Sequence, residues 1–485
     1  MNAVHLKSAS GSSWKFVLVL FLLTAASLIL VSCSDFTISG TLPTPGASKV
    51  TVVVSDPATC LSPNGPYSHV YLTIADIRAN ASDAAAPGDS GWVDLTPNLS
   101  GAPMQVDLLG TPDANCLLAT LGENPDVTPG TFKQFQVILA ANAATVVVNA
   151  CGSSASCVVL ASDSSVHALD ISDEATTGIL ISPKQIVGAE LTVVANRANT
   201  LDINFLACES IVHDENGSYR LRPVVNAGDV RSSSHSLRGN VLDGGTGQPV
   251  KGSVMVALER PDGSGVDRVM WATLAEADGS FIFCPIAFGA YDMVIVGTGS
   301  DGTFYEPSVL RYIPAGTKNI GSVKLYPLMP ASASFATLAG KIGSQTNSHA
   351  GIVLDVKISV LEHAGDIPYF TVPMSPTSDQ SSATENVVTA PPTGALTCPT
   401  KMYCADYSIQ VPAGSINLAN FQKDRTHLSS NATLPTYVIE ATGSVPSSGG
   451  VVVCNSGFPF KTPPVTPSAG GVTVPVPTLN ITHCP

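Results

Sequence analysis

Residues 201–205 read Leu-Asp-Ile-Asn-Phe, a stretch in which apolar and polar side chains alternate. The same alternation occurs at Val70–Ile74 and Phe135–Leu139, and Val50–Val54 is a continuous run of β-branched residues. A repeat of two places every second side chain on the same face of an extended strand. No segment after residue 32 keeps the helical period of about 3.6 residues over three turns. The sequence therefore predicts an all-β protein.

The composition agrees with strands joined by turns. Of the 485 residues 44% are apolar and only 12% are charged, and there are 41 Gly and 36 Pro. So few charges exclude a coiled coil and a charge-rich disordered chain. The formal charge of −14 repels phosphate backbones on average, so we expect no nucleic-acid partner. At roughly 100–200 residues per domain, the chain has room for about three domains.

The first 32 residues have the pattern of a lipoprotein signal peptide. Lys7 and Lys15 precede the apolar stretch Phe16–Val31, which is shorter than the roughly 20 residues that a membrane-spanning helix needs. This stretch ends in Leu-Val-Ser before Cys33, which resembles a bacterial lipobox. We therefore predict that Cys33 carries the lipid (diacylglycerol and palmitate-type acyl chains) and that the membrane is a partner through this anchor. An ordinary signal peptide with an incidental cysteine is the alternative.

The residues after the cysteine bear on location. Ser34 stands where Asp would favour retention in the inner membrane of enterobacteria, so we expect sorting to the bacterial outer membrane, facing the periplasm or the cell surface. Cleavage removes two Lys and leaves a net charge of 21 − 37 = −16. Residues 33–48 are rich in Gly, Pro, Ser and Thr and are predicted to form a lipidated tether.

Shifts in composition divide the rest of the chain into three strand-rich parts. We call residues 49–230 the first part, 237–328 the second part and 337–485 the third part. The polar, Ser-rich residues 231–236 and the segment 329–336 separate them. We expect tandem antiparallel β-sandwich domains.

Local patterns predict two further features. Strands at Phe205–Val212 and Tyr219–Val225 flank Asp-Glu-Asn-Gly at 214–217, which predicts a hairpin, since Asn and Gly tolerate a positive φ. In the third part, the Pro, Ser and Thr-rich segment Gly365–Thr400 predicts a long surface loop.

Short echoes connect the second and third parts. Leu338–Ile342 echoes Leu237–Val241 at an offset of 101 residues, and Val411–Ser415 echoes Ile313–Thr317 at an offset of 98. These offsets fit a diverged repeat of one sandwich type, and chance similarity is the alternative.

Seven stretches of the first part follow one another over about 180 residues in an order that matches a known family: Val52–Pro57, His69–Ile74, Gly91–Leu95, Asp107–Leu109, Pro129–Phe132, Gln136–Leu139 and Leu201–Val225. They resemble a bacterial lipoprotein domain family of unassigned function, the DUF4382 type. The resemblance implies a β-rich fold on a surface lipoprotein and supplies no catalytic residues.

The second part shows another pattern of turns and strands, at Gly239–Asp243, Thr246–Gly252, Asp278–Phe283 and Gly289–Val294. It resembles a carboxypeptidase regulatory-like domain, which is a transthyretin-like sandwich grouped with carbohydrate-binding-like folds. Cys284-Pro285 departs from the usual members. The resemblance implies a seven-stranded sandwich that assists or spaces other domains.

Motifs of catalysis are not found in the sequence. There is no Walker lysine, zincin helix or nucleophile-elbow serine, and no two His lie four residues apart. Gly297–Gly302 matches G-x-G-x-x-G, but the residues that follow do not predict the helix of a dinucleotide site. We therefore predict no enzyme activity, no cofactor and no metal. A hydrolase with a dispersed active site, acting on glycans or other envelope polymers, is the alternative.

The remaining hypothesis is a binding or structural module of the cell envelope, with an envelope glycan or protein as ligand. Outside the signal peptide the chain has two Trp, Trp92 and Trp271, and we expect both to pack in or beside cores rather than to serve as sugar platforms. A strand face rich in Ser and Thr would still bind glycan weakly.

Cysteine parity predicts disulfides. Eleven Cys less Cys33 leave ten, an even number in an oxidising compartment. We expect local bridges Cys151–Cys157 and Cys398–Cys404, and room for a second bridge in the third part, between Cys454 and Cys484. If Cys60 pairs with Cys116, then Cys208 and Cys284 either bridge the first and second parts or remain thiols, and buried thiols are the favoured alternative.

Overall fold

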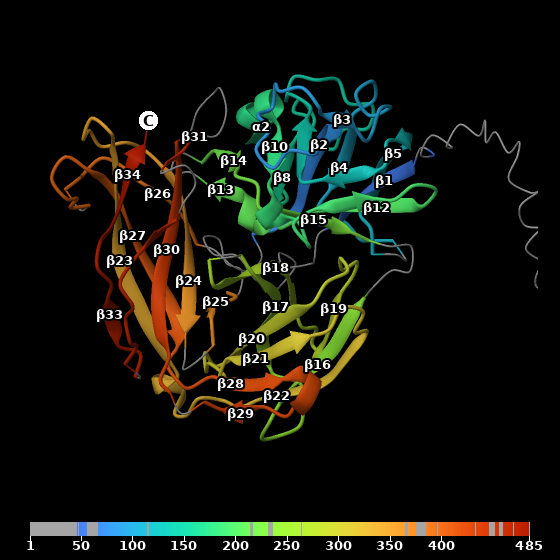
Figure 1. Cartoon of the computed structure of the whole chain (residues 1–485). Coiled ribbons are helices and arrows are strands. Elements are labelled where there is room, and N and C mark those ends of the chain that lie inside the picture. Colours follow the sequence, from blue (N-terminus) through green and yellow to red (C-terminus); the bar gives the residue numbers. More distant parts are fainter. Residues whose placement is uncertain are drawn as a thin grey trace, which may run out of the picture. The chain divides into compact units, whose positions relative to one another are not determined.

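The computed structural model describes residues 46, 48–55, 66–113, 116–213, 217–230, 236–262, 264–363, 367–374, 385–394, 396–431, 433–445, 452–454, 459–468 and 470–484 (Figure 1). The predicted signal peptide, Cys33 and Cys60 lie outside these ranges. The all-β prediction is confirmed, because strands dominate every described part. The helices of the described residues are short. They are α2 (Ser172–Thr177), α3 (Phe421–Asp424) and the 3-10 turns η1 (Pro183–Gln185), η2 (Cys208–Ser210) and η3 (Ala331–Ala333). None of the described helices has the length and apolar character to span a bilayer.

The described residues of the first part form fifteen strands in three sheets. They are β1 (Ser48–Ser55), β2 (Tyr67–Asn80), β3 (Val93–Asp94), β4 (Met104–Asp107), β5 (Ala119–Val127), β6 (Gly130–Phe132), β7 (Gln134–Leu139), β8 (Cys157–Leu160), β9 (Val166–Asp170), β10 (Ile179–Ile181), β11 (Leu191–Val193), β12 (Ala198–Phe205), β13 (Ile211–His213), β14 (Tyr219–Leu221) and β15 (Val225–Asp229). A four-stranded sheet has the order β15-β12-β1-β5, and β2 is central to a nine-stranded sheet.

The alternation of apolar and polar residues at 201–205 decides which face of the four-stranded sheet is apolar. Leu201, Ile203 and Phe205 on β12 are fully buried in the core of the first part, together with Val52 and Val54 of the parallel neighbour β1. The intervening residues of both strands lie on the other face of this sheet, because side chains alternate along a strand. We call that second face, made of β15, β12 and β1, the underside.

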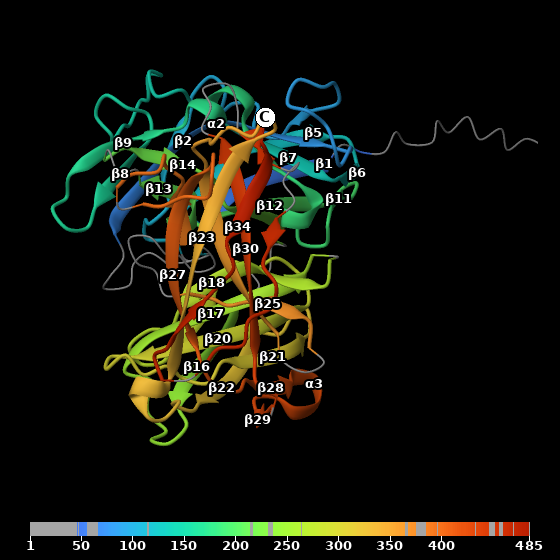
Figure 2. The ribbon, with the colours of Figure 1, turned by 90° about the vertical axis from the view of Figure 1, so that its left-hand side faces the viewer.

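The second and third parts hold the remaining strands. They are β16 (Leu237–Asp243), β17 (Gly252–Pro261), β18 (Val266–Leu274), β19 (Ser280–Phe283), β20 (Tyr291–Gly299), β21 (Ser308–Ile313), β22 (Asn319–Leu325), β23 (Phe335–Thr346), β24 (Asp355–His363), β25 (Tyr369–Thr371), β26 (Glu385–Val388), β27 (Tyr403–Pro412), β28 (Asn417–Asn420), β29 (Ser429–Ser430), β30 (Thr436–Val445), β31 (Val452–Val453), β32 (Phe460–Lys461), β33 (Thr473–Pro475) and β34 (Leu479–Cys484). Figure 2 shows β23, β27 and β34 running together as long strands.

One twelve-stranded sheet contains strands of both the second and the third part. β18 of the second part pairs with β25, and β21 pairs with β28, both in parallel. An unpaired sheet edge exposes hydrogen-bonding groups, and these two pairings cover such edges. At the first seam the backbone N–H of Thr371 donates to a carboxylate oxygen of buried Glu259 (3.1 Å), and its hydroxyl donates to the carbonyl of Asp267 (3.0 Å).

Several pairings are parallel, so the sheets are mixed where the sequence predicted antiparallel sandwiches. In the second part β16 lies between antiparallel β19 and parallel β22. In the third part β23 lies between antiparallel β27 and parallel β33 and β34. The first echo in the sequence therefore falls on two strands with the same kind of neighbours. The second echo does not, because β21 and β27 end within the first two residues of the echoed stretches and pair with different strands.

Two local predictions need correction. The predicted hairpin is shorter, because Phe205 ends β12 and only β13 and β14 pair with each other, from Ile211 to Leu221. Residues 214–216 of its turn lie outside the described residues, and Gly217 has a φ of +84°. Gly365–Thr400 is not loop throughout. The aromatic and β-branched residues Tyr369–Thr371 form β25, and Glu385–Val388 form β26, both beside β24. Sequence reasoning gave too much weight to the Pro and Ser around them.

Buried charges connect the first part with the third. The Nε of Arg222 donates to a carboxylate oxygen of Asp355 at 2.7 Å, and Arg220 donates to the other oxygen. The ammonium of Lys357 donates to the backbone carbonyl of Arg222, and burial lowers the pKa of Lys357 to about 7. Because Asp355 is 3% exposed, removing one arginine would leave a buried charge without its full set of partners.

Glu362 on β24 is another buried acid of the third part. The side chain is fully buried, and the neighbouring Tyr437, whose hydroxyl donates to the carbonyl of Pro412 at 2.8 Å, offsets the effect of that burial only in part. Burial raises the pKa of Glu362 to about 8. The folded protein therefore retains a proton there that the unfolded chain releases near its ordinary pKa of 4.5.

We predict that Glu362→Gln stabilises the protein in mild alkali. Between pH 4.5 and 8 the folded state binds more protons at this site than the unfolded state, so the free energy of unfolding falls as pH rises. A neutral amide removes this fall, and the gain at pH 8.5 is on the order of 4 kcal/mol. Urea unfolding across this pH range measures it. Glu440→Gln is the control: Glu440 pairs with Arg268 and Lys461, so its loss destabilises the protein. Equal pH slopes in wild type and Glu362→Gln would contradict the prediction.

Candidate functional site

A disulfide between Cys116 and Cys284 joins the first part to the second. The Cα atoms are 5.4 Å apart, and 168 residues separate the two cysteines in the chain. The pairing of Cys116 with Cys60 is therefore wrong, as is a free thiol at Cys284. The prediction considered a bridge between the two parts but assigned it to Cys208, because strand parity says which way a side chain points and not which loop of another part lies opposite.

The other three bridges are local to their parts. The structure holds Cys151–Cys157, Cys398–Cys404 and Cys454–Cys484, the same three pairs that the spacing suggested. The separation of 6 residues predicted the first two bridges, and the third joins the two cysteines that then remain in the third part. The long-range bridge had no such signal.

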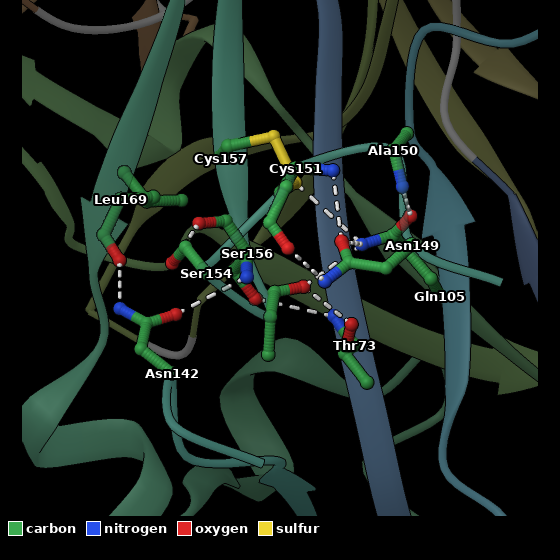
Figure 3. Close-up of a disulfide and its surroundings, with 12 residues drawn as sticks. Thr73, Gln105, Asn142, Asn149, Ala150, Cys151, Ser154, Ser156, Cys157 and Leu169 are labelled. Atoms are coloured by element: carbon green, nitrogen blue, oxygen red, sulfur yellow. Dashed lines mark hydrogen bonds between the residues drawn. A yellow bond between two sulfur atoms is a disulfide. The ribbon is translucent and has the colours of Figure 1, made fainter. Parts of the chain in front are cut away.

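Figure 3 shows how the Cys151–Cys157 loop is held. The Gln105 side-chain amide donates to Asn149 Oδ1 at 3.1 Å and to the carbonyl of Ala155 at 3.0 Å, and its oxygen accepts the backbone N–H of Ala150. Asn142 spans the other side, where it accepts from Ser156 and donates to the carbonyl of Leu169. These bonds give the loop a fixed shape on the first part.

A cleft of about 730 Å³ opens where the first and second parts meet, and the Cys116–Cys284 bridge lies in its wall. From the first part, the loop Leu108–Pro112 and Asn204 line it. From the second part, residues of β16, β18, β19 and β22 line it. Ligand sites in proteins commonly have volumes of roughly 300–1,000 Å³ and lie between structural units. The cleft is therefore the candidate functional site.

The second part contributes one polar sheet face to this cleft. Arg238 on β16 is paired with Ile282 on β19 and with Asn319 on β22, and Asn240 is paired with Ser280. Cross-strand partners share a face, so these five side chains point the same way. Arg238 and Asn319 are exposed, and Ile282 is 51% exposed. The alternate residues of β16 face the core of the second part, since Leu237 and Val241 are buried there.

Two buried residues of the lining carry polar atoms without a hydrogen-bond partner. Trp271 on β18 and Asn204 on β12 are each 1% exposed, yet the indole Nε1 of Trp271 and the Oδ1 of Asn204 bond to nothing. A buried polar group without a partner costs about 1–3 kcal/mol. The Trp271 ring itself packs edge-on against Tyr291 in the core of the second part, as expected for a packing residue.

Asn204 belongs to a polar row on the underside. Its Nδ2 donates to the Ser55 hydroxyl at 3.0 Å, and that hydroxyl donates to Asp202 at 2.8 Å. Burial raises the pKa of Asp202 to about 7, and the hydrogen bond from Ser55 lowers it only in part. The amide of Asn226, the partner of Asn204 on β15, donates to the carbonyl of Met270 at 2.9 Å. The underside therefore bonds directly to the strand that carries Trp271.

Among the described residues, the lining of the cleft contains few ionisable side chains. Glu276 is the single carboxylate among the lining residues, and no His is among them. A glycosidase needs two carboxyl groups and a serine hydrolase needs a base beside its nucleophile. Across the part of the chain that the structure describes, no group of three or more His, Cys, Asp or Glu is placed to hold a metal ion. The G-x-G-x-x-G stretch ends β20 and continues into a turn in which Gly299 N–H donates to the carbonyl of Thr303.

Sequence reasoning missed the cleft residues. The alternation of Arg238 and Asn240 around Gly239 was visible as a strand with a polar face, but nothing in it indicated a facing wall. Asn204 was read only as the polar half of an alternating strand. Trp92, the other tryptophan, lies outside the cleft, and its Nε1 donates to the carbonyl of Ala86 at 3.0 Å.

Comparison with known families matches the first part. Residues 47–223 match the family described as a domain of unknown function (DUF4382). The resemblance stated for the first part is confirmed over this range. No curated protein sequence matches the chain.

Three solved structures with some similarity to the chain are bacterial proteins. The TIE protein of Bacillus anthracis is 8% identical, with 90% of this chain and 51% of that chain covered and a TM-score of 0.16. The chain thus spans about half the length of that protein. The shaft pilin SpaA of Lactobacillus rhamnosus GG is 11% identical over 58% of this chain and 98% of that one (TM-score 0.17), and the minor pilin GBS52 of Streptococcus agalactiae is 12% identical over 52% and 97% (TM-score 0.16). Such low scores establish no shared function.

We predict that losing the bridge at the cleft destabilises the protein more than losing a local one. In the chain-entropy model a 168-residue separation is worth about 5 kcal/mol and a six-residue one about 2 kcal/mol. Cys116→Ser with Cys284→Ser should therefore shift the urea midpoint of the unreduced protein further than Cys151→Ser with Cys157→Ser. Equal shifts in the two double variants would show that the long bridge does not hold the two parts together.

Proposed function

We propose that this protein is a lipid-anchored, non-catalytic module of the cell envelope that binds an envelope glycan in the cleft. The observation that supports it most is the polar sheet face of Arg238, Asn240, Ser280 and Asn319, which lines a cleft containing a single carboxylate and no histidine. Amide, hydroxyl and guanidinium groups hydrogen-bond sugar hydroxyls, and the exposed Ile282 among them offers an apolar contact for a sugar ring.

The anchor in this proposal rests on the sequence alone. The apolar stretch before Cys33 and the Leu-Val-Ser that precedes it favour lipidation. The predicted tether, residues 33–48, would then hold the strand-rich parts close to the membrane surface. An outer-membrane location follows from Ser34 and is part of the same proposal.

The lipid anchor at Cys33 predicts how substitution of this residue changes the membrane association of the protein. Cys33→Ala removes the thiol that receives the lipid, so most of the protein should leave the membrane fraction. Only a small amount, with an uncut N-terminus, should remain there. Ser34→Ala, one residue away, keeps the thiol and should stay in the membrane fraction. Fractionation followed by intact mass measurement decides this. A Cys33→Ala protein that stays fully in the membrane fraction would overturn the lipoprotein hypothesis.

Binding is tested with a glycan array that includes envelope polysaccharides, probed with the full-length protein in detergent. We expect selective binding that Arg238→Ala weakens about tenfold, because the guanidinium is central to the polar face. Arg197→Ala, an exposed arginine outside the cleft, is the matched control. Binding to no glycan on the array, together with capture of an envelope protein that needs Arg238, would replace glycan by protein as the ligand.

A further inference from the structure

The cleft contains an unused hydrogen-bond donor and an unused acceptor at its base, and we propose that one hydroxyl group of the bound saccharide pairs with both. This inference rests on the proposed function, since it concerns how the cleft recognises the bound saccharide. The donor is Trp271 Nε1 and the acceptor is Asn204 Oδ1. They come from different parts of the chain, so the ligand would join the first and second parts at this point.

Independent contacts place the two residues on facing surfaces. Asn204 is paired across β12 and β15 with Asn226. The amide of Asn226 donates to the carbonyl of Met270, which directly precedes Trp271. Trp271 and Asn204 thus lie on either side of one short junction between the underside and β18, and both line the cleft there.

The chemistry of the two atoms restricts the group that satisfies them. An indole N–H only donates, and an amide oxygen only accepts. A hydroxyl accepts with its lone pairs and donates with its proton, so a single hydroxyl can serve both atoms. A carboxylate or phosphate would accept from Trp271 but would repel the amide oxygen, and an ammonium would do the reverse. The pair therefore selects a neutral hydroxyl.

The other polar residues of the lining have the same character, and they lie beside apolar ones such as Leu108, Leu274 and Phe281. Thr111, Asn240, Thr273, Ser280 and Asn319 carry neutral hydroxyl or amide groups, whereas Arg238 and Glu276 are the charged members and have opposite signs. Such a lining favours a neutral polyhydroxylated ligand over a polyanion or polycation. Because Trp271 and Asn204 are each 1% exposed, the hydroxyl reaches them only when a side chain at the base shifts slightly. Bound ligand should then alter the surroundings of Trp271.

The first test uses the strongest-binding oligosaccharide of the array. Trp271→Phe keeps an aromatic ring and removes the N–H, and we expect at least tenfold weaker binding by calorimetry. Trp92→Phe makes the same change outside the cleft, where the lost bond is to the Ala86 carbonyl, and binding should not change. Asn204→Ala removes the acceptor without altering Trp271 and should weaken binding to a similar extent. The full-length lipidated protein in detergent is used throughout.

Monodeoxy derivatives of the same oligosaccharide identify the hydroxyl. One derivative should bind the wild type at least tenfold more weakly than the parent sugar, yet bind Trp271→Phe about as well as the parent does. If every derivative loses the same affinity, relative to the parent sugar, in wild type and in Trp271→Phe, then Trp271 hydrogen-bonds no hydroxyl of the ligand and the inference is wrong.

Fluorescence keeps the inference falsifiable if Trp271→Phe does not fold. After removal of the predicted signal peptide, which contains Trp14, the Trp92→Phe protein has Trp271 as its one tryptophan. Titration with the oligosaccharide should shift or quench its emission at the concentration that calorimetry reports. Glycan binding with unchanged Trp271 emission and unchanged affinity in Asn204→Ala overturns this inference but leaves the proposed function standing. Failure of every glycan to bind the wild type overturns both.

Discussion

Burial of the underside against the second part is the constraint on which the described structure depends. Gly228 on β15 makes it possible: a Cβ there would lie 2.3 Å from the Cβ of Ala287, so no other residue lets the two backbones approach this closely. The backbone N–H of Phe288 then donates to the carbonyl of Asp229 at 3.3 Å. Val187 of the first part is buried in the hydrophobic core of the second. These contacts and the Cys116–Cys284 bridge place the walls of the cleft.

That burial also explains why the interior is unusually polar at this junction. A sheet with one apolar face ordinarily leaves its other face to water. Here the second face is covered, so Ser55, Asp202 and Asn204 must satisfy one another, and they do so incompletely. A protonated Asp202 fits such a place better than an ionised one, because a buried charge without a partner is costly. The polar row is thus a consequence of how the parts stack, and the cleft lies at its end.

The sequence was sufficient for what depends on neighbours in the chain. Alternation at Leu201–Phe205 correctly identified a strand and its buried face, and the spacing of Cys151 and Cys157 matched a bridge. It was insufficient wherever two distant surfaces meet. Cys116 and Cys284, 168 residues apart, show no mutual signal. Asn204 was predicted only as a polar residue of an alternating strand, and Trp271 only as a packing residue. Those features depend on contacts between distant parts of the chain, and the periodicity of a single strand carries no information about such contacts.

The twelve-stranded sheet has a consequence for how the protein could have been assembled in evolution. Because β25 completes the edge beside β18 and β28 completes the edge beside β21, the second part does not contain all of its own sheet neighbours. A gene fragment that ended near residue 330 would encode strands with two uncovered edges, which are templates for association with other chains. The second and third parts are therefore expected to be inherited, duplicated and exchanged together. In this sheet the two form a single structural unit, although composition divides them in two.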